Sequence, residues 1–406
     1  MTMNGTRRNF LKTASSTALG AASLASIPHY ALAAAPTDRR LVFVILRGGM
    51  DGLALIPPFG DPHYRAQRGV LALNPPGQPD GVINLDGFFG LHPSASPLAE
   101  YFQKGEMAAI QAIATPYRRR SHFQAQDILE NGSGSQTGAR DGWLNRAVQA
   151  MGGESGFAVA VGRGVPLVLQ GNAPASSWAP SKLPQPMPGF FDRVGKIYRD
   201  DPLLRNALAE GQKTRSAAEA AMSAEDRRSG RGAKKARDLA GVARVAGAFL
   251  NDENGPRIAV LETSGWDTHA NQGTTRGNLA RRIGNLSNGL ATLAETMKPV
   301  WRKTAIVVIS EFGRTVSPNG SGGTDHGTAG AALLMGGAVN GAGTIAKWPG
   351  LARHQLYESR DLMPTMDSRN LFKGLLAGHF GLSRRALDNK VFLDSANVAP
   401  IRNLIR

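Results

Sequence analysis

Three short apolar runs constrain the fold of this chain most, because each of them stops abruptly at a group of polar residues. The runs cover residues 41–46, 258–261 and 304–310, and none alternates between apolar and polar side chains. Runs of this kind are typical of strands that are buried on both faces of a parallel sheet. We therefore expect an α/β fold, a three-layer sandwich in which helices flank a mostly parallel central sheet.

The polar residues that follow these runs are candidates for a functional site. In chain order they are Asp51 in a glycine-rich turn, Glu262, Asp267 and His269 after the second run, and Glu311 and Arg314 after the third. The carboxyl ends of the strands in an open α/β sheet meet at one crevice, where ligands bind. The sequence therefore predicts a site of carboxylates and histidine at one edge of the sheet.

Helical spacing connects two of the runs. Apolar residues recur every three or four positions from Leu279 to Met297, which predicts one long amphipathic helix. A strand, such a helix and a second strand form a crossover unit, so the second and third runs should be parallel and close together. We further expect strands over residues 107–113 and 165–169, and helices over residues 96–105, 123–131, 143–151 and 368–380.

Residues 1–35 have the pattern of an export signal. Arg7 and Arg8 precede Phe-Leu-Lys, an alanine-rich apolar segment follows, and small residues near Ala33 suit signal-peptidase cleavage. The paired arginines favour the twin-arginine route, so we expect the twin-arginine translocase as a partner and a periplasmic or secreted protein. Residues 36–406 should then form a single α/β domain.

Two segments of that domain have unusual composition. Residues 172–189 are rich in proline and are either a loop that shapes the substrate crevice or an inert surface excursion. Residues 213–237 are densely charged, as in a solvated helical segment or a flexible link.

The composition limits the chemistry. Cysteine is absent, so a metal site has to use His, Asp and Glu. The formal net charge of +16 attracts anionic small molecules or envelope polyanions, or it serves only to keep the surface soluble. No nucleic-acid-binding motif accompanies the charge, so a specific nucleic-acid partner is not expected. The sequence does not specify an oligomeric state.

Ser121 and His326 extend the set of candidates. Ser121 begins a predicted helix, and Gln124 follows in the spacing of a capping box. The same position, beside free backbone amides and the positive end of the helix dipole, also suits a nucleophile that attacks an anionic group. Asp325 and His326 follow a glycine-rich loop downstream of the third run.

Five ordered motifs resemble a family of twin-arginine-exported proteins known as domain of unknown function 1501, and more remotely the alkaline phosphatase and sulfatase superfamily. The motifs are Gly-Gly-Met-Asp-Gly at 48–52, Arg-Ser-His-Phe at 120–123, Gly-Trp-Asp-Thr-His at 265–269, Ser-Glu-Phe-Gly-Arg at 310–314 and Asp-His-Gly at 325–327. The resemblance covers nearly the whole chain after the signal. It implies an alkaline phosphatase-like fold.

The resemblance also implies roles for single residues. Ser121 would be the nucleophile and Arg314 would steady the anion, while the metal ligands would come from Asp51, Glu262, Asp267, His269, Glu311, Asp325 and His326. Glu262 could instead support a ligand through a hydrogen bond. Glu311 and Phe312 stand where alkaline phosphatases have an Asp-His pair. Such a carboxylate-rich site would suit Mn, Ca or Mg as well as Zn.

Two functions follow as hypotheses. The first is an exported metal-dependent hydrolase of phosphate or sulfate esters. The second is a non-catalytic binding or assembly protein of the cell envelope that keeps the fold with a degraded metal site. A redox protein is disfavoured, because no glycine fingerprint for a flavin or nicotinamide follows any of the apolar runs.

Overall fold

A computed structural model of the chain describes residues 37–135, 137–153, 156–180, 187–221, 238–341 and 343–406. The expected export signal at 1–35 lies outside the described residues, as do positions 222–237 of the charged segment and positions 181–186 of the proline-rich one. None of the helices within the described ranges is long and apolar enough to cross a membrane.

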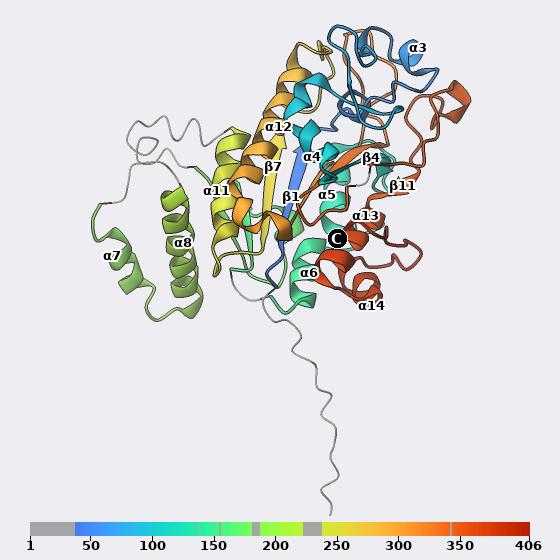
Figure 1. Ribbon diagram of the computed structural model, residues 1–406. Helices are drawn as coiled ribbons and strands as arrows, with labels where there is room; N and C mark the ends of the chain where they lie inside the picture. Colours follow the sequence, from blue (N-terminus) through green and yellow to red (C-terminus); the bar gives the residue numbers. More distant parts are fainter. Residues whose placement is uncertain (1–36, 136, 154–155, 181–186, 222–237, 342) are drawn as a thin grey trace, which may run out of the picture. The chain divides into compact units, whose positions relative to one another are not determined.

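A nine-stranded sheet forms the centre of the fold (Figure 1). Its strands are β1 (Arg40–Arg47), β4 (Met107–Ala114), β5 (Ala158–Val161), β6 (Ala175–Trp178), β7 (Ile258–Ser264), β8 (Thr304–Ser310), β9 (Gly330–Met335), β10 (Gly343–Ile345) and β11 (Met366–Asp367). Eight of them follow the order β10-β4-β9-β8-β1-β7-β5-β6, and β11 pairs with β4. A separate ribbon joins β2 (Ile83–Asn84) to β3 (Gly90–Leu91).

Strand β1 lies in the middle of the sheet, parallel to both β7 and β8. The predicted crossover is therefore confirmed: β7 and β8 are parallel and close together, and β1 lies between them. Among the described strands of this sheet, only β9 runs against its neighbours, since it is antiparallel to β8 and to β4. The expected α/β class with a mostly parallel sheet is confirmed.

The main helices are α2 (Gly52–Leu55), α3 (Tyr64–Arg68), α4 (Ala99–Gln103), α5 (His122–Asn131), α6 (Trp143–Ala150), α7 (Phe190–Ile197), α8 (Pro202–Ala221), α11 (Leu239–Asn251), α12 (Asn278–Thr296), α13 (Ser368–Phe380) and α14 (Arg384–Ala386). Short helices of other types include η2 (Pro93–Leu98), η3 (Leu167–Leu169), η4 (Lys298–Lys303) and η6 (Leu387–Val391).

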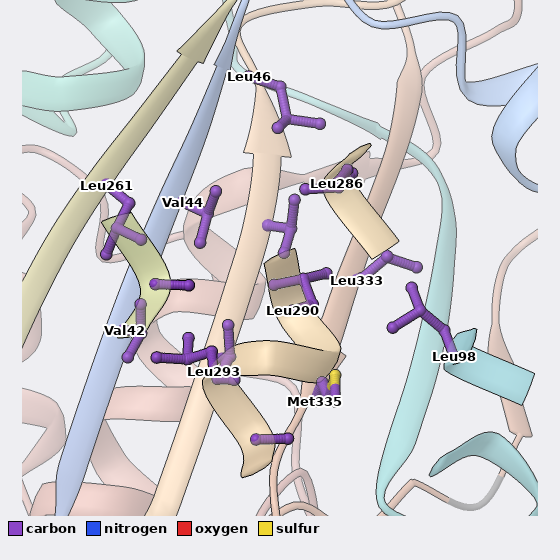
Figure 2. Close-up of a cluster of buried hydrophobic side chains, with 14 of the residues drawn as sticks. Val42, Val44, Leu46, Leu98, Leu261, Leu286, Leu290, Leu293, Leu333 and Met335 are labelled. Atoms are coloured by element: carbon purple, nitrogen blue, oxygen red, sulfur yellow. The ribbon is translucent and has the colours of Figure 1, made fainter. Parts of the chain in front are cut away.

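Two hydrophobic cores cover the two faces of the sheet, which gives the three layers. Successive side chains of a strand point to opposite faces, and Val42, Val44 and Leu46 of β1 accordingly pack with the apolar stripe of α12 (Figure 2). The alternate residues of β1, including Phe43, join the second core. There the rings of Trp143 and Phe372 stack with centroids 4.8 Å apart.

Four expectations about local structure are wrong. Residues 175–178, within the segment expected to be a loop, form strand β6, which pairs with β5. Residues 165–169 form no strand, because the turn η3 begins after Pro166. The helical segment expected to start at Ser96 already begins at Pro93, where the His92 ring accepts a hydrogen bond from the backbone N–H of Ser94. Strand β7 continues as far as Ser264, so Glu262 lies within the strand and not after it.

Candidate functional site

Four polar side chains meet beyond the carboxyl ends of β7 and β8. His122 is the first residue of α5, Asp267 and His269 follow β7, and His326 lies between β8 and β9. These residues are far apart in the sequence, and their segments meet at the same edge of the sheet because β4, β7 and β8 run in the same direction.

Two glycines after β1 let the neighbouring loops approach. A Cβ atom on Gly48 would lie 2.6 Å from the backbone nitrogen of Asp267, and one on Gly49 would lie 2.5 Å from the Phe312 ring. Both glycines also have positive φ angles, 123° and 65°. The glycine-rich motif therefore serves to position the loop that carries Asp267.

The Nε2 atoms of three imidazoles converge on the Asp267 carboxylate. The Nε2 atom of His326 lies 2.9 Å from that of His122 and 3.0 Å from that of His269. Oδ1 of Asp267 is 3.2 Å from Nε2 of His326 and 2.9 Å from Nε2 of His269, and Oδ2 is 3.4 Å from Nε2 of His122. His122, Asp267 and His326 can each offer one ligand atom within 4.8 Å of the others.

A hydrogen-bond acceptor fixes the other nitrogen of each ring. The Nδ1 atom of His122 lies 2.7 Å from Glu311 Oε1, and that of His269 lies 3.2 Å from Asp325 Oδ1. The Nδ1 atom of His326 lies 2.9 Å from the backbone oxygen of Arg120. Carbonyls and ionised carboxylates only accept, so a proton on Nδ1 of each neutral ring satisfies these contacts, and in that tautomer the Nε2 lone pair points inward.

This arrangement fits a cation. Three inward lone pairs and a carboxylate that lie this close repel one another unless a proton or a metal ion lies between them. Metal-binding histidines usually donate their outer N–H to a carboxylate or a backbone carbonyl, and that is the arrangement around all three rings.

Hydrogen bonds, burial and nearby charges shift the pKa values of the site residues in different directions. The hydrogen bond to Glu311 raises the pKa of His122, whereas burial lowers the pKa of His326. Burial by itself would raise the pKa of Asp267, but the hydrogen bond from Arg314 and the nearby positive charges outweigh it and lower the pKa. The Asp267 carboxyl group is therefore ionised at neutral pH.

Arg314 forms an ion pair with Asp267. Its side chain is fully buried, and Nη1 donates to Asp267 Oδ1 over 2.6 Å. Its Nε and Nη2 atoms donate to the side chain and backbone of Thr324. These contacts show a residue that orients a carboxylate of the site.

Glu311 belongs to the site through His122. Besides that ring, its Oε1 atom accepts hydrogen bonds from Gly48 N at 2.9 Å and Gln126 Nε2 at 3.1 Å. Its Oε2 atom accepts from Ser310 Oγ at 2.9 Å. Burial by itself would raise the pKa of Glu311, but hydrogen bonds, foremost the one from His122, lower it below its ordinary value. Glu311 thus contacts the imidazole, as Asp325 does at His269.

Asp51 makes a different set of contacts. Its Oδ1 atom caps α2 by accepting from the backbone nitrogens of Leu53 and Ala54. Its Oδ2 atom accepts from Arg68 Nη2 at 2.5 Å and from Gln272 Nε2 at 2.7 Å. The carboxylate is 1% exposed and uses both oxygens within the fold.

Glu262 and Ser121 also lie outside the group formed by His122, Asp267, His269 and His326, which we call the imidazole group. Glu262 pairs with Arg47, whose Nε atom lies 3.0 Å from Glu262 Oε1, and Arg47 also contacts Glu130 over 2.9 Å. Ser121 occupies the N-cap position of α5, but its side chain makes no capping hydrogen bond. The capping-box geometry that the sequence permits is therefore not formed.

His122 is the residue of the site that the sequence did not identify. It lies in the motif Arg-Ser-His-Phe, where attention falls on the adjacent serine. A histidine that opens a helix has no distinctive spacing to any other ligand. Only the contact between α5 and the loops after β7 and β8 shows its role.

Comparisons with known proteins add a family and distant structural likenesses. Residues 89–391 match the family described as Protein of unknown function (DUF1501). No curated protein sequence matches the chain.

The structural likenesses are weak. The crystal structure of Ps i-CgsB in complex with k-i-k-neocarrahexaose is 10% identical, with a TM-score of 0.38, over 90% of this chain and 77% of that one. The C-terminal periplasmic domain of EcEptC from Escherichia coli is 13% identical, with a TM-score of 0.38, over 88% of this chain and 87% of that one. Neither likeness identifies a residue of the site.

Proposed function

Because the chain belongs to the family described as Protein of unknown function (DUF1501), whose description gives no activity, we propose a function from its own side chains. We propose that the protein is an exported, metal-dependent hydrolase of phosphate or sulfate esters.

One observation carries this proposal. The Nε2 atoms of His122, His269 and His326 turn toward the Asp267 carboxylate, and each ring is held from behind by an acceptor. A fold that needed these rings only for packing would not have to align three lone pairs. We infer that His122, Asp267 and His326 hold a divalent ion and that His269 is a fourth ligand or borders the ion.

The donor set narrows the choice of ion. Calcium and magnesium prefer oxygen ligands, whereas imidazoles with one carboxylate suit zinc or manganese better. His122 makes the site richer in nitrogen than the sequence suggested. When bound, such an ion supplies Lewis acidity that polarises an ester oxygen and lowers the pKa of a water molecule.

The remaining residues supply orientation and charge. Arg314 keeps Asp267 ionised and in place. The Ser121 hydroxyl is not used as a cap, which leaves it available as the attacking group at the start of α5. Arg119 is exposed two residues before it, and the excess of basic residues in the chain favours an anionic substrate. Export through the twin-arginine route, with residues 1–35 as the signal, completes the proposal.

Metal content and turnover measured together test this function. The mature chain should contain close to one equivalent of a transition metal and hydrolyse at least one member of a panel of phosphate and sulfate esters. Asp267→Ala should lose both properties. Asp127→Ala, which changes an exposed carboxylate on α5, serves as the matched control and should keep both. Lack of metal in the purified protein, with Asp267→Ala indistinguishable from wild type, would overturn the proposal.

Trapping a covalent intermediate tests the role of Ser121. If Ser121 attacks the ester, acid quenching during turnover should leave the phosphoryl or sulfuryl group on the wild-type chain and none on Ser121→Ala. An active enzyme without such an adduct would mean that water attacks directly.

A specific observation supports the second candidate, a non-catalytic envelope binding or assembly protein. Asp51, which the resemblance makes a metal ligand, is committed to Arg68, Gln272 and the start of α2. A site reduced in this way could bind a metal and an anionic partner without turnover. Stoichiometric metal without hydrolysis of any ester in the panel would favour this candidate.

A further inference from the structure

A cavity of about 300 Å³ lies beside the loop that carries the metal-site residues. Its walls come from the end of β7, the first turn of α11 and the first half of α12, and they include Leu239, Glu262, Ser264, Trp266, Arg282 and Asn285. This volume is at the lower end of the range for ligand pockets, roughly 300–1,000 Å³. It is large enough for one ring-sized group.

The motif Gly-Trp-Asp-Thr-His connects this cavity to the imidazole group. Trp266 lines the cavity, and the next residue, Asp267, belongs to the imidazole group. Trp266 is fixed, since it is 1% exposed and its Nε1 atom donates to Thr263 Oγ1 over 2.7 Å. The segment that contains Trp266 and Asp267 therefore borders both the cavity and the imidazole group.

Gly265 of the same motif shapes the cavity. Its φ angle is +89°, and a Cβ atom there would lie 2.4 Å from the guanidinium of Arg282. The absence of a side chain lets the guanidinium lie against the backbone, where Nη1 donates to the Ser264 carbonyl over 2.9 Å. Among the described residues no carboxylate pairs with Arg282, so the rest of its donors can serve a ligand.

The chemistry of the walls favours an uncharged ligand with many hydroxyl groups. Arg282, Asn285 and Ser264 offer donors, and Glu262 and Asn285 offer acceptors. Leu239, Val242 and Leu286 supply an apolar wall. A second anion is disfavoured, because Glu262 pairs with Arg47 and the carboxylate of Asp238 balances the cation of Arg282, so the walls carry no excess of positive charge. A saccharide ring combines hydroxyl edges with an apolar face and matches this lining.

We propose that the cavity is a subsite for a neutral saccharide ring, which forms the non-reacting part of the substrate. This inference rests on the proposed function only in taking the saccharide as part of a substrate, since binding of the ring itself requires no metal. The ester group would then lie toward Asp267, and the sugar that carries it would lie beyond Trp266.

Binding of neutral sugars to the intact mature protein tests the subsite. The probes are glucose, galactose, N-acetylglucosamine and their disaccharides, measured by saturation-transfer NMR and by calorimetry. At least one should bind, and Arg282→Ala and Asn285→Leu should each weaken it about ten-fold or more, as expected for lost hydrogen bonds from a charged or amide group. Arg281→Ala, on the same helix but outside the lining, should bind as wild type does.

Two further measurements separate this inference from the proposed hydrolase. Asp267→Ala should still bind the saccharide, because its change lies in the imidazole group, so an inactive protein that binds sugar retains the subsite. If the wild type is active, Arg282→Ala should raise KM for sugar esters and leave KM for a small aryl ester unchanged. The subsite is wrong if no probe binds, if both cavity variants bind as well as Arg281→Ala, or if inorganic phosphate displaces the sugar from Asp267→Ala. Asn285 is exposed, so its variant should fold even if Arg282→Ala does not.

Discussion

Each imidazole of the candidate site contacts an acceptor on its outer side, and the three acceptors differ in burial or in chemical kind. Glu311 is almost completely buried and receives hydrogen bonds from several donors, whereas Asp325 is largely exposed. The partner of His326 is a backbone carbonyl, which no substitution removes. His122 is therefore the ring whose orientation depends most on a side chain that can be changed.

Glu311→Gln tests that dependence at the scale of one residue. The amide keeps the size of the side chain but can present its NH2 group to His122, which removes the acceptor that fixes the tautomer. We expect affinity for zinc to fall about 10- to 100-fold, measured by competition with a chromophoric chelator. Asp127→Asn removes an exposed carboxylate on the same helix as His122 and should leave the affinity unchanged. Equal affinities for Glu311→Gln and wild type would show that Glu311 does not support a ligand.

A second residue-scale prediction concerns His379, a buried histidine of α13. Its Nε2 atom lies 2.8 Å from the carbonyl of Arg40, and its Nδ1 atom is buried without a partner. Burial lowers its pKa from 6.5 to about 4. Between these values the unfolded chain binds more protons, so the stabilising contribution is complete above pH 6.5 and is lost as the pH falls toward 4.

The expected loss is about 2 kcal/mol of unfolding free energy between pH 7 and pH 5, as estimated from that shift by linkage. Urea denaturation at the two pH values measures it. In His379→Gln, which can keep a donor near the Arg40 carbonyl, the difference between the two pH values should shrink by that amount. An unchanged difference would mean that the ring is accessible to protons in the folded protein.

The sequence indicates some residues of the candidate site and not others. Asp267, His269 and His326 were identified because they follow apolar runs and lie in motifs. His122 was missed, and Asp51 was grouped with the ligands although it pairs with Arg68. Pairing between a turn residue and an arginine of α3 depends on the folded path of residues 52–68, and no local pattern encodes it.

Regular elements were predictable when their patterns were long. The helices α12 and α13 were expected over nearly the ranges they occupy, because α12 has several turns of apolar spacing and α13 starts at the N-cap Asp367. The strand expected over residues 165–169 is wrong, because a run of five apolar residues is compatible with either a strand or a turn. The antiparallel direction of β9 could not be predicted, since it depends on the irregular path between β8 and β9.

The packing of α12 gives a prediction at the scale of one element. Leu290 is 2% exposed and lies in the core between α12 and the sheet (Figure 2). Leu290→Ala should lower the unfolding free energy by about 2–5 kcal/mol, through lost burial and a residual cavity. Asn288→Ala, on the exposed face of the same helix, should change it by less than about 0.5 kcal/mol. Thermal and urea unfolding of both variants compare these values, and similar losses would contradict the assigned face.

At the scale of the whole molecule, metal binding should stabilise the fold. An ion that binds only the folded chain adds about 2.7 kcal/mol to the unfolding free energy at a free concentration 100 times its Kd. Adding zinc to the chelator-treated protein should therefore raise Tm in a concentration-dependent way. Asp267→Ala should show no such rise, and an equal rise in that variant would place the bound ion elsewhere.

The position of β1 at the centre of the sheet has a consequence for the order of folding. It precedes the other described strands in the sequence, yet its two partners, β7 and β8, come much later in the chain. Pairing between segments so distant in the sequence is slow, and unpaired apolar strands aggregate easily. Strand β1, which is almost entirely buried in the folded protein, must therefore stay unpaired until both partners have been made, and the newly made chain needs protection from aggregation until Ser310 has emerged.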